Sequence, residues 1–175
     1  MRPTRRRFLT LTGGALVLAG SAAAVVRTRG YDLPKERTDR LKAFSIWQAV
    51  VFDAVARRIA APDLPAEVPS ADDAGVTDFV DAYVSGMHPA LRKDVLRLIG
   101  FVEHVAPFLA RKTSRFTRLG EGDQDAVLAK LESHDQDLLR GCFAGLKSLV
   151  FMGYYRDPRT WSVIGYSGPL VSRER

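Results

Sequence analysis

The chain has 175 residues, of which 46% are hydrophobic and 26% charged, a balance that is ordinary for a single globular domain. Its formal net charge of +6 suggests a polyanionic partner, but four of the 26 basic residues lie within the first 24 positions, where there is no acid. The rest of the chain has 22 basic and 20 acidic residues, which gives a net charge of +2. This small charge argues against a nucleic-acid partner. The single cysteine, Cys142, can form neither an internal disulfide nor a thiolate metal site.

The first 26 residues have the pattern of an export signal. Residues 4–9, TRRRFL, fit the twin-arginine pattern Ser/Thr-Arg-Arg-x-Phe-Leu, and an apolar, glycine-containing stretch follows up to residue 26. The residues that carry this signal are Arg5, Arg6, Phe8 and Leu9. Because the twin-arginine translocase carries folded proteins, we expect export of a folded chain to the periplasm or to the outer face of the cytoplasmic membrane.

The end of this segment allows two outcomes. Small residues at positions 21–24, SAAA, form an A-x-A cleavage site in which Ala22 and Ala24 are the small residues, and residues 27–37 are then a polar spacer. The alternative is an uncleaved membrane anchor, since residues 8–26 carry no charge and are just long enough to cross a bilayer. The glycines and alanines of this run make it weakly hydrophobic, which favours cleavage.

Residues 38–175 are predicted to form one helical domain after the signal helix. Apolar residues recur there at spacings of three and four, the pattern of amphipathic helices. Helices are expected from Thr38 or Asp39 to residue 59, and over residues 76–87, 91–109, about 123–131 and about 135–152. Pro107 is expected to kink or end the third of them, and three prolines between residues 62 and 69 indicate a long loop after the first. No alternating run is long enough for a strand, so the fold class is all-α, an irregular bundle of four to six helices.

The C-terminal segment is predicted to form one more short helix and then an extended tail. Asp157 is suited to the N-cap, Pro158 to the first helical position and Gly165 to the C-cap of a helix over residues 158–164. Aromatic residues surround this helix, and tyrosine and tryptophan suit both a protein core and a protein interface. The sequence therefore leaves two alternatives open: the segment packs back on the bundle, or it presents Trp161 and Tyr166 to a partner.

The residues that most often carry catalysis form no recognisable motif. His88, His104 and His134 lie on separate predicted elements without the spacing of a metal-binding helix, so surface or structural roles are expected for them. Cys142 lies on the apolar side of a predicted helix, where an inert buried thiol is the common case. The glycines of LGEGD lack the preceding strand and the Lys-Ser/Thr of a phosphate-binding loop. No catalytic, cofactor or metal site is therefore predicted in this chain.

These features together resemble the small-subunit family called gluconate 2-dehydrogenase subunit 3. The resemblance covers the twin-arginine leader, the Pro-rich acidic loop, FTRLGEGDQDAVLAKLE and GYYRDPRTWSVIGYSGP. Family members carry a pattern like Gly-Tyr-Tyr-x-x-Pro-x-x-Trp-x-x-x-Gly-Tyr-x-Gly-Pro. The residues that match it are Gly153, Tyr154, Tyr155, Pro158, Trp161, Gly165, Tyr166, Gly168 and Pro169.

The resemblance implies a non-catalytic subunit of a membrane-associated dehydrogenase that oxidises a sugar, a sugar acid or a related alcohol. In such complexes a large flavoprotein subunit of the GMC type binds FAD and lacks an export signal, and a cytochrome c subunit often passes the electrons onward. FAD, and optionally an iron–sulfur cluster or haem c, belong to these partner subunits. The small subunit supplies the twin-arginine signal and helps the large one to fold. The residues expected to contact the large subunit are Tyr154, Tyr155, Pro158, Trp161, Tyr166 and Pro169. The alternative is a stand-alone exported helical protein, either membrane-tethered or metal-binding.

Overall fold

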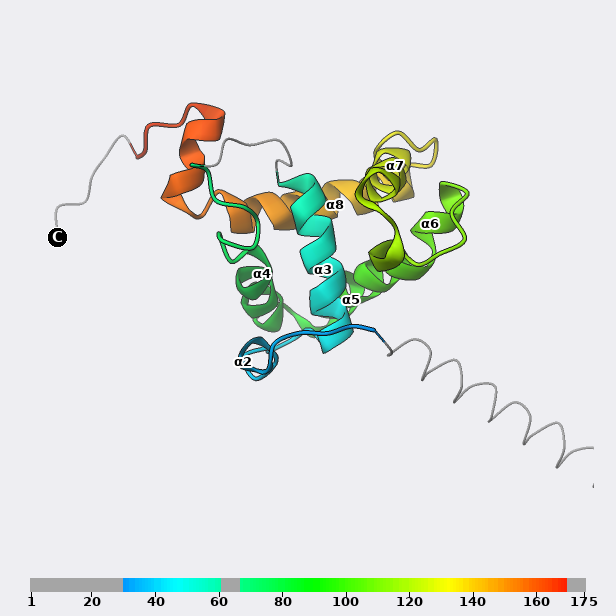
Figure 1. Cartoon of the computed structure of the whole chain (residues 1–175), viewed down its shortest axis with the longest axis horizontal. Helices are drawn as coiled ribbons and strands as arrows, with labels where there is room; N and C mark the ends of the chain where they lie inside the picture. The colour runs from blue at the N-terminus through cyan, green and yellow to red at the C-terminus, as the bar shows by residue number, and fades with distance from the viewer. Residues whose placement is uncertain (1–29, 61–66, 170–175) are drawn as a thin grey trace, which may run out of the picture. The chain divides into compact units, whose positions relative to one another are not determined.

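The computed structural model describes residues 30–60 and 67–169 (Figure 1). The chain divides into one unit over residues 1–32 and a second, Leu33–Arg175, which holds the helices. The predicted signal and cleavage positions, Arg5, Arg6, Phe8, Leu9, Ala22 and Ala24, lie outside the described residues, as does the alternative anchor over residues 8–26. Within the part of the chain that is described, no helix combines the length and the apolar character needed to cross a bilayer.

The second unit is all-α in its described part, which confirms the predicted fold class. Its long helices are α3 (Ile46–Ile59), α4 (Val76–Ser85), α5 (Pro89–His104), α7 (Glu121–Glu132) and α8 (Asp137–Tyr154). Its short elements are α2 (Lys35–Thr38), α6 (Ala106–Leu109) and the 3-10 helices η1 (Phe116–Arg118) and η2 (Pro158–Ile164). Pro107 acts as predicted, because α5 ends at His104 and the chain restarts as α6.

Helix α3 lies in the middle of the bundle, where it contacts α4, α5, α7, α8 and η1 (Figure 1). Its buried apolar side chains include Val51, Phe52 and Val55, and full burial of such a side chain contributes about 1.5–3 kcal/mol. Helix α8 crosses α3 and packs against α4 near its C-terminal end and against α7 near its start. Packing around α3 therefore sets the positions of both ends of α8, and with them the position of the C-terminal segment.

The first long helix begins later than predicted. A start at Thr38 or Asp39 is wrong, because Thr38 ends the separate helix α2 and α3 begins only at Ile46. The cause is a buried carboxylate on α4. The Asp81 carboxylate accepts three backbone N–H groups from the loop between α2 and α3. The donors are Lys42 at 2.7 Å, Ala43 at 2.8 Å and Phe44 at 2.6 Å. These amides are therefore unavailable to a continuous helix.

A local cap then fixes the first residue of α3. The Gln48 side-chain oxygen accepts the Ser45 N–H at 2.9 Å and lies 2.8 Å from the Ser45 hydroxyl. A serine before the helix and a glutamine three residues later is a known start signal, which satisfies a backbone N–H that the helix leaves unpaired. The start at Ile46 therefore follows from both this cap and the Asp81 contacts.

Helix α2 is held to the bundle by one arginine. Arg37 forms a two-pronged ion pair with the buried Asp53 of α3, at 3.0 and 3.1 Å, and also contacts Asp78 of α4 at 3.2 Å. The hydrogen bonds to Asp53 raise the pKa of the Arg37 guanidinium, so it stays charged at any pH that the fold tolerates. The Leu33–Arg175 unit thus begins with an ionic contact to two helices.

Gly153 marks the closest approach of α8 to α4. A Cβ atom at this position would lie 3.0 Å from Val76 Cγ1 and 3.2 Å from the Val76 carbonyl oxygen. Gly153→Ala is therefore expected to lower the free energy of unfolding by about 1–3 kcal/mol, measured by urea denaturation. Gly141→Ala, in the same helix but facing open space, is the matched control and is expected to raise it by about 0.5–1 kcal/mol. Equal stability of the two variants would contradict this account of the α4–α8 contact.

Candidate functional site

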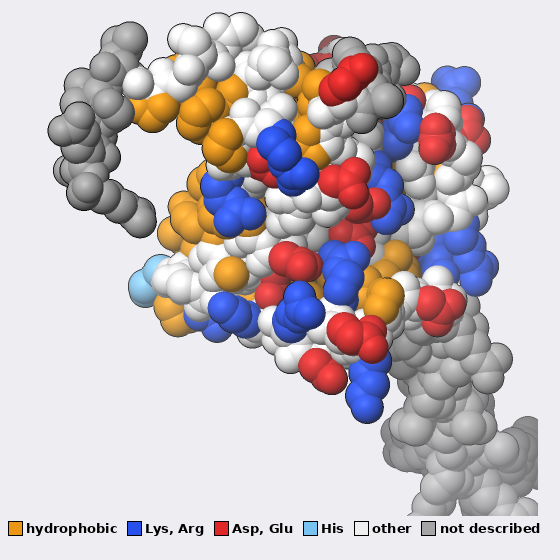
Figure 2. Space-filling view, turned by 60° about the vertical axis from the view of Figure 1, so that its left-hand side comes forward, with side chains coloured by type: hydrophobic (Ala, Val, Ile, Leu, Met, Phe, Trp, Pro, Cys, Tyr) orange, Lys and Arg blue, Asp and Glu red, His pale blue; other side chains and the backbone are white. Residues whose placement is uncertain are grey.

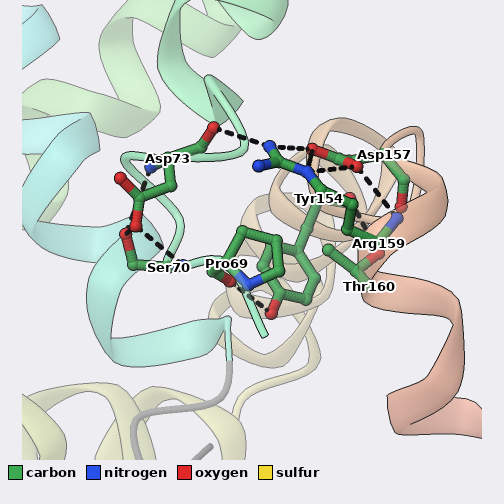
Figure 3. Close-up of polar contacts among 7 residues, drawn as sticks. All are labelled: Pro69, Ser70, Asp73, Tyr154, Asp157, Arg159 and Thr160. Atoms are coloured by element: carbon green, nitrogen blue, oxygen red, sulfur yellow. Dashed lines mark hydrogen bonds and ion pairs between the residues drawn. The ribbon is translucent and has the colours of Figure 1, made fainter. Parts of the chain in front are cut away.

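The C-terminal segment, residues 153–169, is fixed to the bundle by Tyr154 (Figure 3). The Tyr154 side chain is completely buried, and its hydroxyl donates to the Pro69 carbonyl oxygen at 2.9 Å. Burial raises the pKa of this hydroxyl, so it remains a donor at neutral pH. Buried Thr160 of η2 adds a second attachment, since its hydroxyl lies 3.1 Å from the Tyr154 carbonyl oxygen and 2.8 Å from that of Asp157.

Helix η2 begins and ends where local sequence signals predict. The Asp157 carboxylate accepts the Arg159 N–H at 2.9 Å and also binds the Arg159 guanidinium, which in turn donates to the Asp73 carbonyl oxygen at 3.2 Å (Figure 3). Side-chain hydrogen bonding from Arg159 holds the pKa of the Asp157 carboxyl below its usual range, so the cap is ionised at neutral pH. At the other end Gly165 has φ +64°, a left-handed conformation that favours glycine and turns the chain out of the helix.

After this turn the chain folds back over the Trp161 ring. The Trp161 indole N–H donates to the Tyr155 carbonyl oxygen at 2.8 Å, and the Tyr166 ring stands edge-on to the Trp161 ring at 5.0 Å between centroids. Gly168 lies against the same ring, where a Cβ atom would come within 3.4 Å of it. The tail therefore has a defined position up to at least Gly168.

Further ring contacts extend this group across α8 and α4. Tyr155 packs on Phe151 of α8 at 5.4 Å between centroids, the Arg156 guanidinium lies 4.8 Å from the Phe79 ring centroid of α4, and Phe79 stacks with Tyr83 at 6.3 Å. We call the resulting patch the aromatic surface, and its members are Phe79, Tyr83, Phe151, Tyr155, Trp161 and Tyr166. Figure 2 shows hydrophobic side chains gathered along the left-hand edge of the molecule.

The aromatic surface is partly open to solvent. Tyr83 is 46% exposed and Tyr166 45% exposed, while Ile164, three residues after Trp161, is 55% exposed. Monomeric proteins seldom expose a contiguous group of large apolar side chains, and such a group with a polar surround marks a binding surface. The arrangement suits contact with another protein, since tyrosine and tryptophan are the residues most enriched in the centres of interfaces.

The structure combines the two alternatives that the sequence left open for this segment. Tyr154 packs inward and offers no side-chain surface, which corrects the expectation that it contacts a partner directly. Tyr155 and Trp161 are half-buried, and Pro158, Tyr166 and Pro169 are exposed. The buried residues hold the segment in place, and the exposed ones are available for contact.

The α4 part of the aromatic surface was not predicted from the sequence. Phe79 and Tyr83 belong to the apolar residues that predicted the helix over residues 76–87, but in the structure only the neighbouring row of valines, Val76, Val80 and Val84, is completely buried. The apolar stripe consists of two adjacent rows, each with a spacing of four residues. The width of the stripe could have predicted the exposed row, because a stripe this wide exceeds what one helix–helix contact covers.

The three histidines lie apart in the described structure. His88 caps α5, where its Nδ1 accepts the Ala90 N–H at 3.3 Å, and the His134 Nδ1 accepts the Gln136 N–H at 3.1 Å before α8. His104 ends α5, with its ring 6.0 Å from that of Trp47. Over residues 30–60 and 67–169, no three His, Cys, Asp or Glu side chains gather into a group able to hold a metal ion.

Cys142 is partly buried in α8. Burial raises the pKa of its thiol, which disfavours the thiolate that a nucleophile or a metal ligand requires. This environment is that of a packing residue, in line with the interpretation from its sequence position.

Loss of the buried tyrosine hydroxyl is expected to destabilise the fold. In Tyr154→Phe the ring stays but the Pro69 carbonyl loses its donor, so the free energy of unfolding should fall by about 1–2 kcal/mol in urea denaturation. Tyr166→Phe removes an equivalent hydroxyl from an exposed ring and should leave stability unchanged. The attachment through Tyr154 is disproved if both variants match the parent.

Comparison with known proteins gives one family. Residues 48–168 match the family model described as gluconate 2-dehydrogenase subunit 3. The matched region extends from the first turn of α3 to Gly168, and so includes the whole aromatic surface. No significant match to a curated protein or to a solved structure is found.

Proposed function

Because the chain belongs to the gluconate 2-dehydrogenase subunit 3 family, we propose that it escorts and stabilises the FAD-dependent large subunit of a dehydrogenase complex. Membership of this family supports the role of an accessory subunit in such a complex. The partner is a flavoprotein of the GMC type that oxidises a sugar, a sugar acid or a related alcohol, with a cytochrome c subunit as a further member. FAD is held by the partner, and this chain contributes the surface on which the partner assembles.

The aromatic surface is the observation that supports this role most directly. Its rings are held in place before any partner binds, through the buried Tyr154 hydroxyl, the Trp161 indole N–H and the packing of Gly168. A surface that is already ordered loses little conformational freedom on binding, which favours a tight and long-lived complex. Such a complex is what an escort requires.

Export gives the physical reason for a stable complex. The twin-arginine translocase moves proteins that are already folded, so a flavoprotein loaded with FAD in the cytoplasm can cross the membrane with one signal if the two chains bind first. The contact must then survive translocation, which suits a large apolar interface rather than a transient one of about 1,200 Å² or less. The proposed site of function is the periplasm or the outer face of the cytoplasmic membrane.

A double substitution, at Tyr166 of the aromatic surface and at Ile164 beside it in η2, tests this proposal. Ile164→Ser with Tyr166→Ser removes two exposed apolar side chains and should weaken binding of the flavoprotein about tenfold or more, at about 1 kcal/mol for each interface residue. The measurement is the amount of FAD-containing protein that co-purifies with the tagged chain from the native host. Leu138→Ser, which replaces a 76% exposed leucine at the start of α8, is the control and should retain the parent amount. Equal loss in the control, or no loss in the double variant, would contradict the assignment of this surface.

A further inference from the structure

A second surface lies around α6 and η1, at the opposite end of the Leu33–Arg175 unit from η2 (Figure 1). Residues 104–120, HVAPFLARKTSRFTRLG, contain four basic residues and no acid. The nearest acids along the chain, Glu103 and Glu121, stand just outside this stretch. Four positive charges therefore fall within 17 consecutive residues that hold no acid.

The acidic groups that face this stretch are already engaged. Glu103 is completely buried and accepts the Thr117 N–H at 3.0 Å and the Thr117 hydroxyl at 2.7 Å, with the Arg115 Nε at 3.5 Å. Asp123 binds the Lys112 ammonium at 2.6 Å. The Glu121 carboxylate binds Arg58 of α3 at 3.0 Å.

Two of the four basic residues remain uncompensated. Arg111 and Arg118 are exposed, and neither forms an ion pair with any residue of the described ranges. Arg111 is also the one non-glycine residue in the described chain with a positive φ, +58°. Its turn is closed by the Lys112 N–H, which donates to the Pro107 carbonyl oxygen at 2.8 Å. An arginine in this conformation is less favourable than a glycine, so the side chain is present at a cost to the fold.

Apolar side chains lie next to Arg111, whose backbone N–H donates to the Phe108 carbonyl oxygen at 3.0 Å. Helix α6 buries Ala106 and Pro107, and this packing directs Phe108 outward, where it is 63% exposed. Val105, three residues earlier, is 46% exposed. We call Val105, Phe108, Arg111 and Arg118 the basic tip.

We propose that the basic tip binds the surface of a bilayer that contains anionic phospholipids. An aromatic ring beside uncompensated arginines is the combination that inserts at the headgroup boundary while the charges contact lipid phosphates. A protein partner fits less well, because two exposed apolar side chains fall far short of the roughly 1,200 Å² that a stable protein interface buries. The inference does not depend on the proposed function, since it concerns a different end of the unit and a different class of ligand.

The test uses the full-length chain and a label that responds to an apolar environment. In a Cys142→Ser background, a nitrobenzoxadiazole fluorophore is attached at Phe108→Cys or, as the control position, at Ile164→Cys on η2. The labelled chains are mixed with vesicles of phosphatidylcholine alone or of phosphatidylcholine with phosphatidylglycerol. Every variant has the same N-terminal segment, so membrane contact by that segment is common to all of them, and the variants without Arg111 or Arg118 separate it from contact by the basic tip.

The expected result is a rise in fluorescence at position 108 with the anionic vesicles, little change with phosphatidylcholine alone, and little change at position 164 with either. High salt should reverse the rise, because it screens the contact between arginine and phosphate. Arg111→Gln and Arg118→Gln should each raise the lipid concentration needed for half of the signal by about fivefold, from roughly 1 kcal/mol per basic residue near an anionic surface. Circular dichroism confirms that each variant is folded.

Two outcomes would overturn the proposal. One is the absence of a fluorescence rise at position 108 with phosphatidylglycerol vesicles. The other is a rise of the same size in phosphatidylcholine alone or in the variants without Arg111 and Arg118. Neither outcome affects the flavoprotein proposal, which is tested separately at Ile164 and Tyr166.

Discussion

Exchange of Arg5 and Arg6 for lysine is expected to leave the activity of the partner flavoprotein almost entirely in the cytoplasm. Lysine keeps both positive charges but lacks the planar guanidinium, so the twin-arginine pattern is lost while the charge of the segment is unchanged. The two positions lie outside the described helices, and the Leu33–Arg175 unit should therefore fold and bind its partner as before. The measurement is dehydrogenase activity in the periplasmic and cytoplasmic fractions of the native host.

The matched control for this exchange is Arg2→Lys with Arg7→Lys. Arg2 and Arg7 lie on either side of the pair and carry the same charge, but they do not occupy the two arginine positions of the twin-arginine pattern. The control should export the flavoprotein normally. If the flavoprotein also reaches the periplasm normally in the Arg5/Arg6 variant, the escort role is wrong.

Replacement of Asp81 by asparagine is expected to lower the free energy of unfolding by about 3 kcal/mol, a loss of about a hundredfold in the folding equilibrium. One carboxylate oxygen accepts the Lys42 N–H, and the other accepts those of Ala43 and Phe44. Asparagine keeps the shape but replaces one of these acceptors with an NH₂ donor, which then faces a backbone N–H in a buried site. Urea denaturation measures the change.

Asp78→Asn provides the comparison within the same helix. Asp78 is an exposed acid whose contact is one arm of the Arg37 guanidinium, and an exposed ion pair contributes about 1 kcal/mol or less. The account requires the Asp81 variant to be clearly the less stable of the two. Similar stabilities would show that the backbone of residues 42–44 does not depend on the Asp81 carboxylate.

A comparison of Asp157 with Asp81 shows why one helix boundary was predicted from the sequence and another was missed. The start and end of η2 depend on neighbours within a few residues, Asp157 with Arg159 and Gly165 with its own φ, so local rules were sufficient. The start of α3 depends on Asp81, which is distant in sequence and reaches residues 42–44 because α4 packs on α3. An apolar period that continued through Leu41 and Phe44 could not reveal that contact.

In the candidate site, too, residues in a local pattern were predicted correctly, whereas a residue whose contact is distant in sequence was not. The sequence singled out Trp161 and Tyr166 because their pattern is local, and both lie on the aromatic surface. It also grouped Tyr154 with them, although the Tyr154 hydroxyl points to Pro69, a residue 85 positions away. Whether a tyrosine faces a partner or the core depends on which distant carbonyl is near it, and periodicity carries no information about that.

The central claim is that this chain holds a flavoprotein rather than acting on a substrate itself. The most direct measurement is purification of the tagged chain from its native host, followed by an absorption spectrum and a dehydrogenase assay of the eluted material. The account predicts that a second polypeptide elutes with it, that this material shows the flavin spectrum and oxidises a sugar or alcohol substrate, and that the chain separated from its partner is inactive. A chain that elutes alone, folded and catalytically active, would contradict the account.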